Sequence, residues 1–211
     1  TDLPAREITK EINKIVEELE VPYVEPENAI ASGLIDYCDD IILQAYRKEL
    51  AGLSFAAAPR DKVVMKVIYT PLHGTGAEII PQILRDTGIV EVHGIDEQNE
   101  MNPDCPTVKY PNPEEPEVFN MAQAKGKKIG AELLLATDLD GDRLGVMVAD
   151  KFGGYRLLSG NQLGCLLLDY ILSRGKEAGI LTEKSIIIQT VVTTAMSKAI
   201  ARAYGVGVIE T

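Results

Sequence analysis

Three aspartates carry the strongest chemical signal in this sequence: Asp138, Asp140 and Asp142. They follow the apolar run Leu133 to Ala136, which is typical of a buried strand, and Gly141 allows the chain to turn tightly between them. Carboxylates at alternating positions of a curling loop can face one centre, where unpaired charges repel and raise one another's pKa values. Because Mg²⁺ prefers oxygen ligands and would remove this conflict, the pattern predicts a magnesium site.

Other sites could use part of the same pattern. A calcium-binding EF-hand loop needs glycine and glutamate where Arg143 and Ala149 stand, so this interpretation fails. A haloacid-dehalogenase-like phosphatase would use Asp138 as nucleophile and Asp140 as acid and base, although threonine is usual in that superfamily where Asp142 stands. A non-catalytic module that binds metal only for stability is a third possibility. The phosphatase and the metal-binding module stay open as alternatives.

The elements that must position these residues alternate between strands and helices. The sequence predicts an α/β fold class, with mixed β-sheet layers and helices on both faces. A polar, proline-rich stretch over 96–116 interrupts the pattern. We expect strands over 63–69, 89–95, 133–136, 144–149, 185–190 and 206–209, and helices over 77–87, 117–127, 161–172 and 194–204.

Two amphipathic helices are expected before this α/β region. One runs from Ala5 to Leu19 and the other from Asp36 to Leu50, with Gly52 as its stop. Neither helix contains a cluster of polar residues that could form a site, so both are interpreted as connecting helices. The apolar face of the first helix consists of Ile8, Ile12, Ile15 and Leu19. In the second helix, the residues expected to point inward are Ile41, Ile42, Ala45, Tyr46 and Leu50.

Composition and charge exclude several classes of protein. The 211 residues are 45% hydrophobic and 25% charged, which is typical of a folded protein. The net charge of −11 would repel nucleic acid and anionic lipid, so neither nucleic acid nor a membrane is an expected partner. The apolar runs fall short of the roughly 18 residues of a membrane span. Three widely spaced cysteines are typical of free thiols in a reducing compartment, which predicts a cytoplasmic protein.

Four segments, in order, resemble segments of the α-D-phosphohexomutases, the phosphoglucomutase and phosphomannomutase family. The resemblance runs over roughly residues 35–211 and leans toward the phosphoglucomutase-like branch. Tyr69 to Gly76 is similar to the strand and loop that begin the family's second domain, and Tyr110 to Glu115 is similar to its Pro-Asn-Pro-Glu segment. Thr137 to Val146 is similar to the metal-binding loop, and Gly160 to Gly164 is similar to the entry of the third domain.

The resemblance implies an activity and roles for particular residues. Asp138, Asp140 and Asp142 would bind Mg²⁺ together with a phosphoserine oxygen from the first domain, and Arg143 would lie beside that phosphoserine. The family transfers a phosphoryl group from this serine to a hexose phosphate, forms a hexose 1,6-bisphosphate and takes the other phosphoryl group back. The implied partners are therefore the hexose phosphate, the bisphosphate and the missing domains of the parent chain.

The resemblance also implies how the chain is divided. Residues 1–35 would be the tail of domain 1 and a linker, residues 36–154 the metal-binding domain 2, and residues 155–211 the start of a truncated domain 3. Leu139 stands where proline is usual, and no Ser-His-Asn-Pro-type segment could supply the phosphoserine. We therefore expect a piece of a longer enzyme that is inactive alone, with glucose, mannose and glucosamine phosphates all open as substrates.

The loop over 70–76 has a weaker second interpretation. With Asp96 downstream it mimics a dinucleotide-binding fingerprint, but Ile79 occupies the third glycine position and a structural turn is favoured. His73 in this loop is interpreted as a surface or turn residue, with a direct role on substrate as the alternative. Lys125, Lys127 and Lys128 are interpreted as charges that complement a helix C-terminus.

Overall fold

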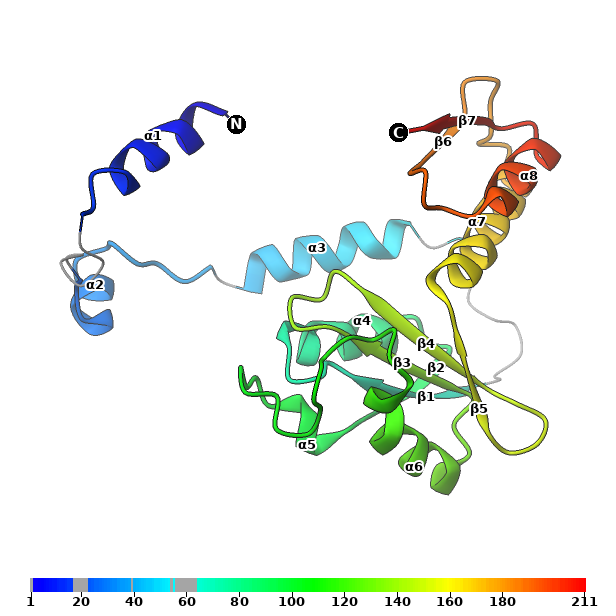
Figure 1. Ribbon diagram of the computed structural model, residues 1–211, viewed down its shortest axis with the longest axis horizontal. Coiled ribbons are helices and arrows are strands. Elements are labelled where there is room, and N and C mark those ends of the chain that lie inside the picture. Colours follow the sequence, from blue (N-terminus) through cyan, green and yellow to red (C-terminus); the bar gives the residue numbers. More distant parts are fainter. Residues whose placement is uncertain (1, 17–22, 39, 54, 56–63) are drawn as a thin grey trace. The chain divides into compact units, whose positions relative to one another are not determined.

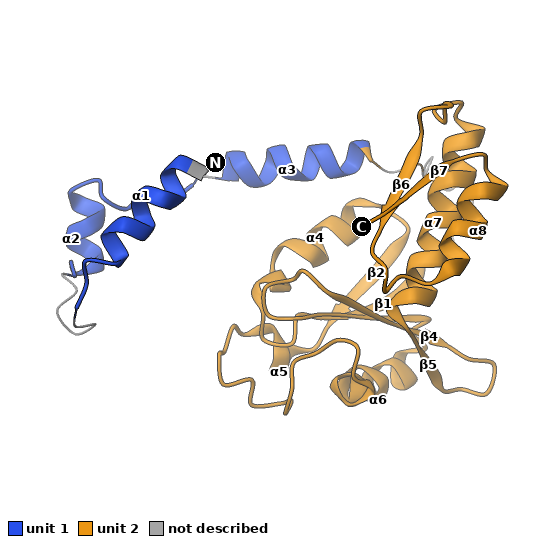
Figure 2. Ribbon diagram, turned by 45° about the horizontal axis from the view of Figure 1, so that its top comes forward, with its two compact units in different colours: residues 1–52 blue, residues 53–211 orange. Residues whose placement is uncertain are grey.

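The computed structural model describes residues 2–16, 23–38, 40–53, 55 and 64–211. It divides the chain into two compact units, residues 1–52 and residues 53–211 (Figure 2). The finer division into 1–35, 36–154 and 155–211 stays a prediction. Within the described residues, no helix combines the length and the apolar character that crossing a membrane requires.

The first unit consists of helices. They are α1 (Asp2–Ile12), α2 (Pro26–Ala31) and α3 (Asp40–Gly52). Both predicted helices are present with shifted bounds: α1 ends before Leu19, whose neighbourhood over 17–22 lies outside the described residues, and α3 includes Gly52 rather than stopping before it. The short helix α2 was not predicted.

The predicted inward face of the second of these helices, α3, is wrong for the described part of the chain. Helix α3 buries none of its residues, and Ile41 and Ile42 are 70% and 63% exposed. In α1, Ile8 and Ile12 are exposed as well. Periodicity shows that a helix has an apolar side, but it does not say that another element covers that side.

A five-stranded mixed sheet forms the centre of the second unit (Figure 1). Its order is β2-β1-β3-β4-β5, in which β1, β2 and β3 are parallel and β4 and β5 are antiparallel to their neighbours. The sheet confirms the predicted mixed α/β fold, but β5 was not predicted. The strands are β1 (Met65–Thr70), β2 (Val90–Gly94), β3 (Leu133–Thr137), β4 (Leu144–Ala149) and β5 (Tyr155–Leu158).

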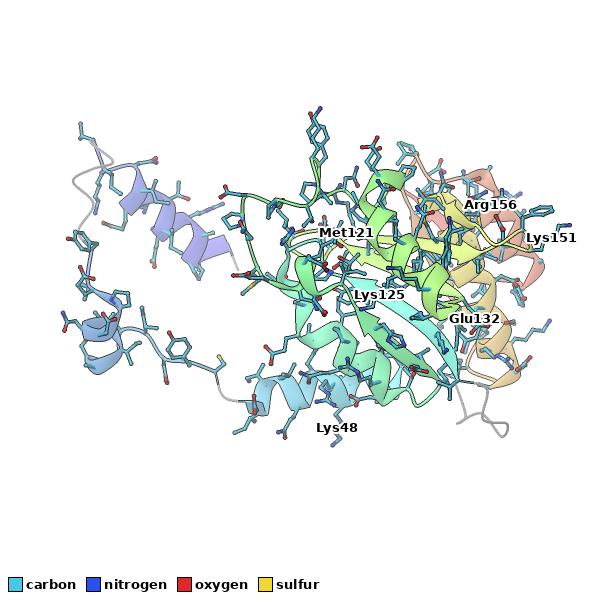
Figure 3. The ribbon with its side chains drawn as sticks, turned by 90° about the horizontal axis from the view of Figure 1, so that it is seen from below. Lys48, Met121, Lys125, Glu132, Lys151 and Arg156 are labelled. Atoms are coloured by element: carbon cyan, nitrogen blue, oxygen red, sulfur yellow. The ribbon has the colours of Figure 1, made fainter. Side chains whose placement is uncertain are left out.

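Helices α4 (Ile79–Asp86) and α6 (Asn120–Ile129) cover opposite faces of this sheet (Figure 1). Short helical turns lie within the connections: η2 (Thr75–Ala77), α5 (Asp96–Asn99) and η3 (Pro116–Phe119). The side chain of Lys125 on α6, labelled in Figure 3, donates a hydrogen bond to the carbonyl of Gly94, with Nζ 2.8 Å from the oxygen. The lysine thereby ties α6 to the end of β2.

The core of the sheet is made by residues with no exposed surface that come from strands, a helical turn and the loop after β1. Each large apolar side chain buried in this way contributes roughly 1.5–3 kcal/mol to stability. The largest of them are Ile68, Leu72, Phe119 and Leu134.

A second α/β segment follows the sheet. It contains α7 (Gly160–Glu177), β6 (Ile186–Gln189), α8 (Ala195–Ala203) and β7 (Gly207–Glu210), and β6 pairs with β7 in parallel. A small separate core of Leu172, Ala201 and Val206 holds these elements together. This βαβ arrangement confirms the pattern expected for the end of the sequence.

Candidate metal centre

The three aspartates lie on the loop that connects the antiparallel strands β3 and β4, here called the metal loop (Asp138–Arg143). Pairing of Thr137 with Leu144 closes the base of this loop. One carboxylate oxygen from each of Asp138, Asp140 and Asp142 lies within 4.8 Å of the others. The structure thus brings together the three carboxylates that the sequence pattern singled out.

The turn of the metal loop depends on Gly141. Its φ of +74° is in the left-handed region that residues with a side chain rarely adopt. Its backbone N–H donates to the carbonyl of Asp138, with the nitrogen 3.2 Å from the oxygen. The expected role of this glycine in the turn is confirmed.

Asp138 and Arg143 hold each other at the two ends of the metal loop. The Nε atom of Arg143 donates to Oδ2 of Asp138 at 2.6 Å, and the backbone N–H of Arg143 donates to Oδ1 at 3.1 Å. Burial of Asp138 by itself would raise the pKa of its carboxyl, but these hydrogen bonds and the positive charge outweigh burial and lower that pKa. Asp138 is therefore held as an anion.

Asp142 is compensated less well, because the nearby positive charge of Arg143 does not outweigh its negative neighbours. The charges of Asp140 and then Asp138 raise the pKa of Asp142, because like charges disfavour ionisation of their neighbour. Arg143 lies 3.8 Å from Asp142, measured from Nε to Oδ1, and its closest hydrogen bond is to Asp138. An all-oxygen donor set with excess negative charge fits a hard divalent cation such as Mg²⁺.

Arg143 has a second partner outside the metal loop. Its Nη1 atom donates to Oδ1 of Asn112 at 3.2 Å. Asn112 belongs to the Pro-Asn-Pro-Glu segment, so two of the segments that resembled the family in the sequence meet at this arginine.

The strand ends beneath the metal loop are joined by two buried hydroxyl groups. The oxygens of Tyr69 on β1 and Thr137 on β3 lie 2.8 Å apart. Burial raises the pKa of Tyr69 to about 12, although the hydrogen bond with Thr137 acts in the opposite direction. The two strands that carry the loops of the site are thus joined by a side-chain contact as well as by their ladder.

Sequence reasoning missed the contact between the metal loop and the loop that follows β1. The backbone N–H of Thr75 donates to the carbonyl of Leu139, with 2.8 Å between nitrogen and oxygen. A Cβ atom on Gly74 would stand 2.6 Å from Cα of Leu139, so only glycine permits this approach. The available signal was topological, because neighbouring parallel strands present their following loops at the same edge of a sheet.

His73 lies in this second loop but is buried, with 3% of its surface exposed. Both of its ring nitrogens contact protein atoms, the carbonyl of Glu100 and the hydroxyl of Thr107. The burial of His73 contradicts a surface position, whereas its φ of +68° within a turn agrees with the other half of the interpretation.

Known proteins match both the sequence and the fold. A family model described as "Phosphoglucomutase/phosphomannomutase, alpha/beta/alpha domain II" matches residues 44–153. A phosphoglucomutase of Staphylococcus haemolyticus is 31% identical over 204 residues, which covers 97% of this chain and 36% of that protein. A phosphoglucomutase of Staphylococcus aureus is 33% identical over 138 residues, covering 65% of this chain and 24% of that protein.

Solved structures of such proteins share the fold. A phosphoglucomutase/phosphomannomutase family protein of Burkholderia thailandensis has a TM-score of 0.60 at 22% identity, covering 80% of this chain and 32% of that chain. Aspergillus fumigatus N-acetylphosphoglucosamine mutase, solved with GlcNAc-6P and magnesium, has a TM-score of 0.51 at 21% identity, covering 80% of this chain and 34% of that chain.

The fold and the family match together define the class of protein, because residues 44–153 match the α/β/α domain II of the family. The chain belongs to the phosphoglucomutase/phosphomannomutase family. It spans about a third of the length of the Staphylococcus haemolyticus relative and of the solved structures it matches.

Proposed function

We propose that this chain is part of a Mg²⁺-dependent phosphohexomutase that interconverts hexose 1-phosphate and hexose 6-phosphate through a phosphoserine and a hexose 1,6-bisphosphate. The observation that supports this most strongly is the convergence of three carboxylates and one arginine in a single loop inside the matched family domain. The likeness to phosphoglucomutases gives glucose phosphate as the first substrate to test.

In this proposal Asp138, Asp140 and Asp142 hold the metal ion. When bound, Mg²⁺ would supply electrostatic stabilisation of the phosphoryl oxygens, which is the main requirement of phosphoryl transfer. The buried Asp138 fixes the base of the site because both of its oxygens accept hydrogen bonds from Arg143. The exposed Asp140 and Asp142 contribute the charge that attracts the cation.

Arg143 has the catalytic role in this proposal. Because its Nε atom bonds to Asp138, its terminal nitrogens extend beyond the aspartate, and Nη1 reaches Asn112. A guanidinium group suits the geometry of phosphate oxygens. We place the transferring phosphoryl group at this terminal edge of Arg143, where the positive charge would stabilise it.

We further propose that the chain does not complete the catalytic cycle alone. The phosphoserine, the sugar-binding segment and the C-terminal phosphate-binding loop of the family find no counterpart in the 211 residues. The chain's partners would then be the other domains of the same enzyme, besides the hexose phosphate and the bisphosphate.

Phosphorus NMR tests the proposal. The chain is mixed with Mg²⁺, glucose 1-phosphate and a catalytic amount of glucose 1,6-bisphosphate, and the same mixture is made with a longer parent protein. We expect glucose 6-phosphate only with the parent, and its loss in the parent's Asp138→Asn variant. A parent that forms no glucose 6-phosphate would contradict the proposed activity on glucose phosphates.

The same experiment separates the two alternatives from the mutase. If the chain alone produces inorganic phosphate and Asp138→Asn abolishes this production, the protein is a phosphatase with Asp138 as nucleophile. No turnover in any mixture, combined with metal-dependent stability, would identify a non-catalytic metal-binding module.

A further inference from the structure

A network of hydrogen-bonded polar groups holds the loop after β1, which is the loop that contacts Leu139. The hydroxyl of Thr70 donates to Oε1 of Gln98 at 2.7 Å, and Nε2 of Gln98 donates to the hydroxyl of Thr107 at 3.0 Å. The Thr107 oxygen lies 2.8 Å from Nε2 of His73, and Nδ1 of His73 lies 3.0 Å from the carbonyl of Glu100. Thr70 and Gln98 have no exposed surface and His73 is buried, whereas Thr107 and Glu100 are exposed residues, so the network runs from the core to the surface.

The direction of these hydrogen bonds follows from the groups themselves. The Glu100 carbonyl can only accept, so Nδ1 of His73 must carry the hydrogen. Thr107 accepts from Gln98, and its own hydrogen can then be donated to Nε2 of His73. Each of the side-chain nitrogens and oxygens named here has a hydrogen-bond partner in this arrangement. A polar network whose members are paired in this way favours one conformation.

The backbone of His73 is held by the same segment of the chain. Its N–H donates to the carbonyl of Gln98 at 2.9 Å, and its carbonyl accepts from the N–H of Asn102 at 3.2 Å. Both Leu72 and His73 have left-handed backbone conformations, with φ of +48° and +68°. Because residues with side chains adopt this region only when the surroundings impose it, the contacts to the 98–107 segment account for the shape of the loop.

This imposed shape brings the next two residues against the metal loop. Gly74 approaches Leu139 so closely that no Cβ atom would fit, and Thr75 donates its N–H to the Leu139 carbonyl. Leu139 stands between two of the three carboxylate residues. A displacement of His73 would therefore be passed through Gly74 and Thr75 to the position of the carboxylates.

We propose that His73, Gln98 and Thr107 are positioning residues of the metal centre, and that they fix the conformation of the metal loop through the contact of Gly74 and Thr75 with Leu139. None of them needs to touch the metal ion or the substrate. The consequence for metal affinity rests on the proposed function, but the fixing of the loop does not.

Thr107 offers the sharpest test because its residue is exposed, so it can be changed without filling or emptying the core. Thr107→Val removes the hydroxyl that joins Gln98 to His73, and Thr107→Ser keeps it. The matched control is Tyr155→Phe, which deletes a hydroxyl that donates to the carbonyl of Ala131 at 2.7 Å on another part of the sheet.

The first readout is amide hydrogen exchange without metal. Loss of one buried hydrogen bond is expected to speed exchange of the Thr75, Gly141 and Arg143 amides about ten-fold in Thr107→Val, relative to the Leu134 amide in the sheet. Thr107→Ser should restore the wild-type rates, and Tyr155→Phe should show no selective change at the metal loop. Uniform exchange changes in Thr107→Val, or equal changes in Tyr155→Phe, would overturn the proposal.

The second readout is the affinity for Mn²⁺, measured by electron paramagnetic resonance. We expect Thr107→Val to bind Mn²⁺ more weakly than wild type and Thr107→Ser to bind it as wild type does. Unchanged Mn²⁺ affinity in Thr107→Val, despite faster exchange at the loop, would refute the consequence for the metal. Wild-type protein that binds no Mn²⁺ would refute the proposed metal site, whereas the exchange rates would still decide whether these residues fix the loop.

Discussion

Asp138 accepts two hydrogen bonds from Arg143, one from the side chain at 2.6 Å and one from the backbone at 3.1 Å. The pair closes the metal loop on itself, because the two residues stand at its opposite ends. A carboxylate that would otherwise be destabilised by burial is thereby kept ionised, and the arginine is kept at the mouth of the site.

Replacement of Arg143 should therefore affect turnover more than metal binding. In a full-length parent we expect Arg143→Ala to lower kcat by roughly 100-fold or more, since a charge that stabilises the transferring group is lost. The Mg²⁺ concentration for half-maximal activity should change less, because Asp140 and Asp142 keep their charges. Steady-state kinetics at several Mg²⁺ concentrations measure both effects.

Arg156→Ala is the matched control for this substitution, because Arg156 lies on β5 and outside the metal loop (Figure 3). It should leave kcat unchanged. Equal losses of turnover and metal affinity in Arg143→Ala would show instead that Arg143 serves only to hold Asp138.

Neutralising Asp140 should abolish the stabilisation of the protein by Mg²⁺. Asp140→Asn removes the main charge that raises the pKa of Asp142, so the variant should be no less stable than wild type without metal. Mg²⁺ at ten times its dissociation constant should stabilise wild type by about 1.4 kcal/mol, or about 3–6 °C in melting temperature. We expect this increase to disappear in Asp140→Asn and to persist in Glu183→Gln, which alters an exposed carboxylate outside the metal loop. Thermal unfolding followed by circular dichroism, with and without Mg²⁺, gives the comparison.

Tyr69 should make the protein sensitive to alkali. Its pKa is raised from 10.0 to about 12, so the folded state keeps a proton that the unfolded state loses. Its contribution to stability is fully present below pH 10, falls as the pH rises from 10 to 12, and is lost above that. The free energy of unfolding should fall by about 3 kcal/mol over this interval from Tyr69 alone.

Urea unfolding at a series of pH values measures this slope. Tyr69→Phe should reduce the slope of the unfolding free energy against pH by the contribution of one proton, which is about 1.4 kcal/mol per pH unit. Tyr110→Phe, which removes an exposed hydroxyl, should retain the wild-type slope. An unchanged slope in Tyr69→Phe would mean that another group controls alkaline unfolding.

The start of α7 provides a test of local stability. The hydroxyl of Ser159 accepts from the N–H of Gln162, and the Gln162 side chain accepts from the N–H of Ser159. Removing this capping box by Ser159→Ala should cost about 1 kcal/mol of unfolding free energy, and Ser159→Asp should restore most of it. Chemical denaturation of the three proteins decides, and a stability loss below the error of the method would contradict the capping role.

The sequence contained the local parts of this structure but not the long-range ones. The alternating pattern predicted the sheet, and the spacing of the aspartates indicated the metal loop, because both depend on neighbouring residues. The four-residue strand β5 was missed because it lacks the β-branched residues that indicated the equally short strands β6 and β7. The apolar side of α3 was visible, whereas its exposure was not.

The surroundings of the candidate site were harder to predict than its ligands. Nothing local links Thr75 to Leu139, although parallel pairing of β1 with β3 places the loops after these strands at one edge. The partners of His73 lie in the polar stretch over 96–116, where the sequence has no period to interpret. Such contacts depend on the three-dimensional path of the chain, which neither spacing nor composition encodes.

The order of strands in the sheet also bears on how the site forms during folding. β3, the metal loop and β4 are contiguous in sequence and pair as a hairpin, so the carboxylates gather through contacts of low sequence separation. The pairing of β1 with β3 instead closes a long stretch of intervening chain, which costs more entropy and is slower. The aspartates are accordingly expected to come together before Gly74 and Thr75 contact Leu139. The site therefore reaches its final rigidity only when the slow parallel pairing is complete.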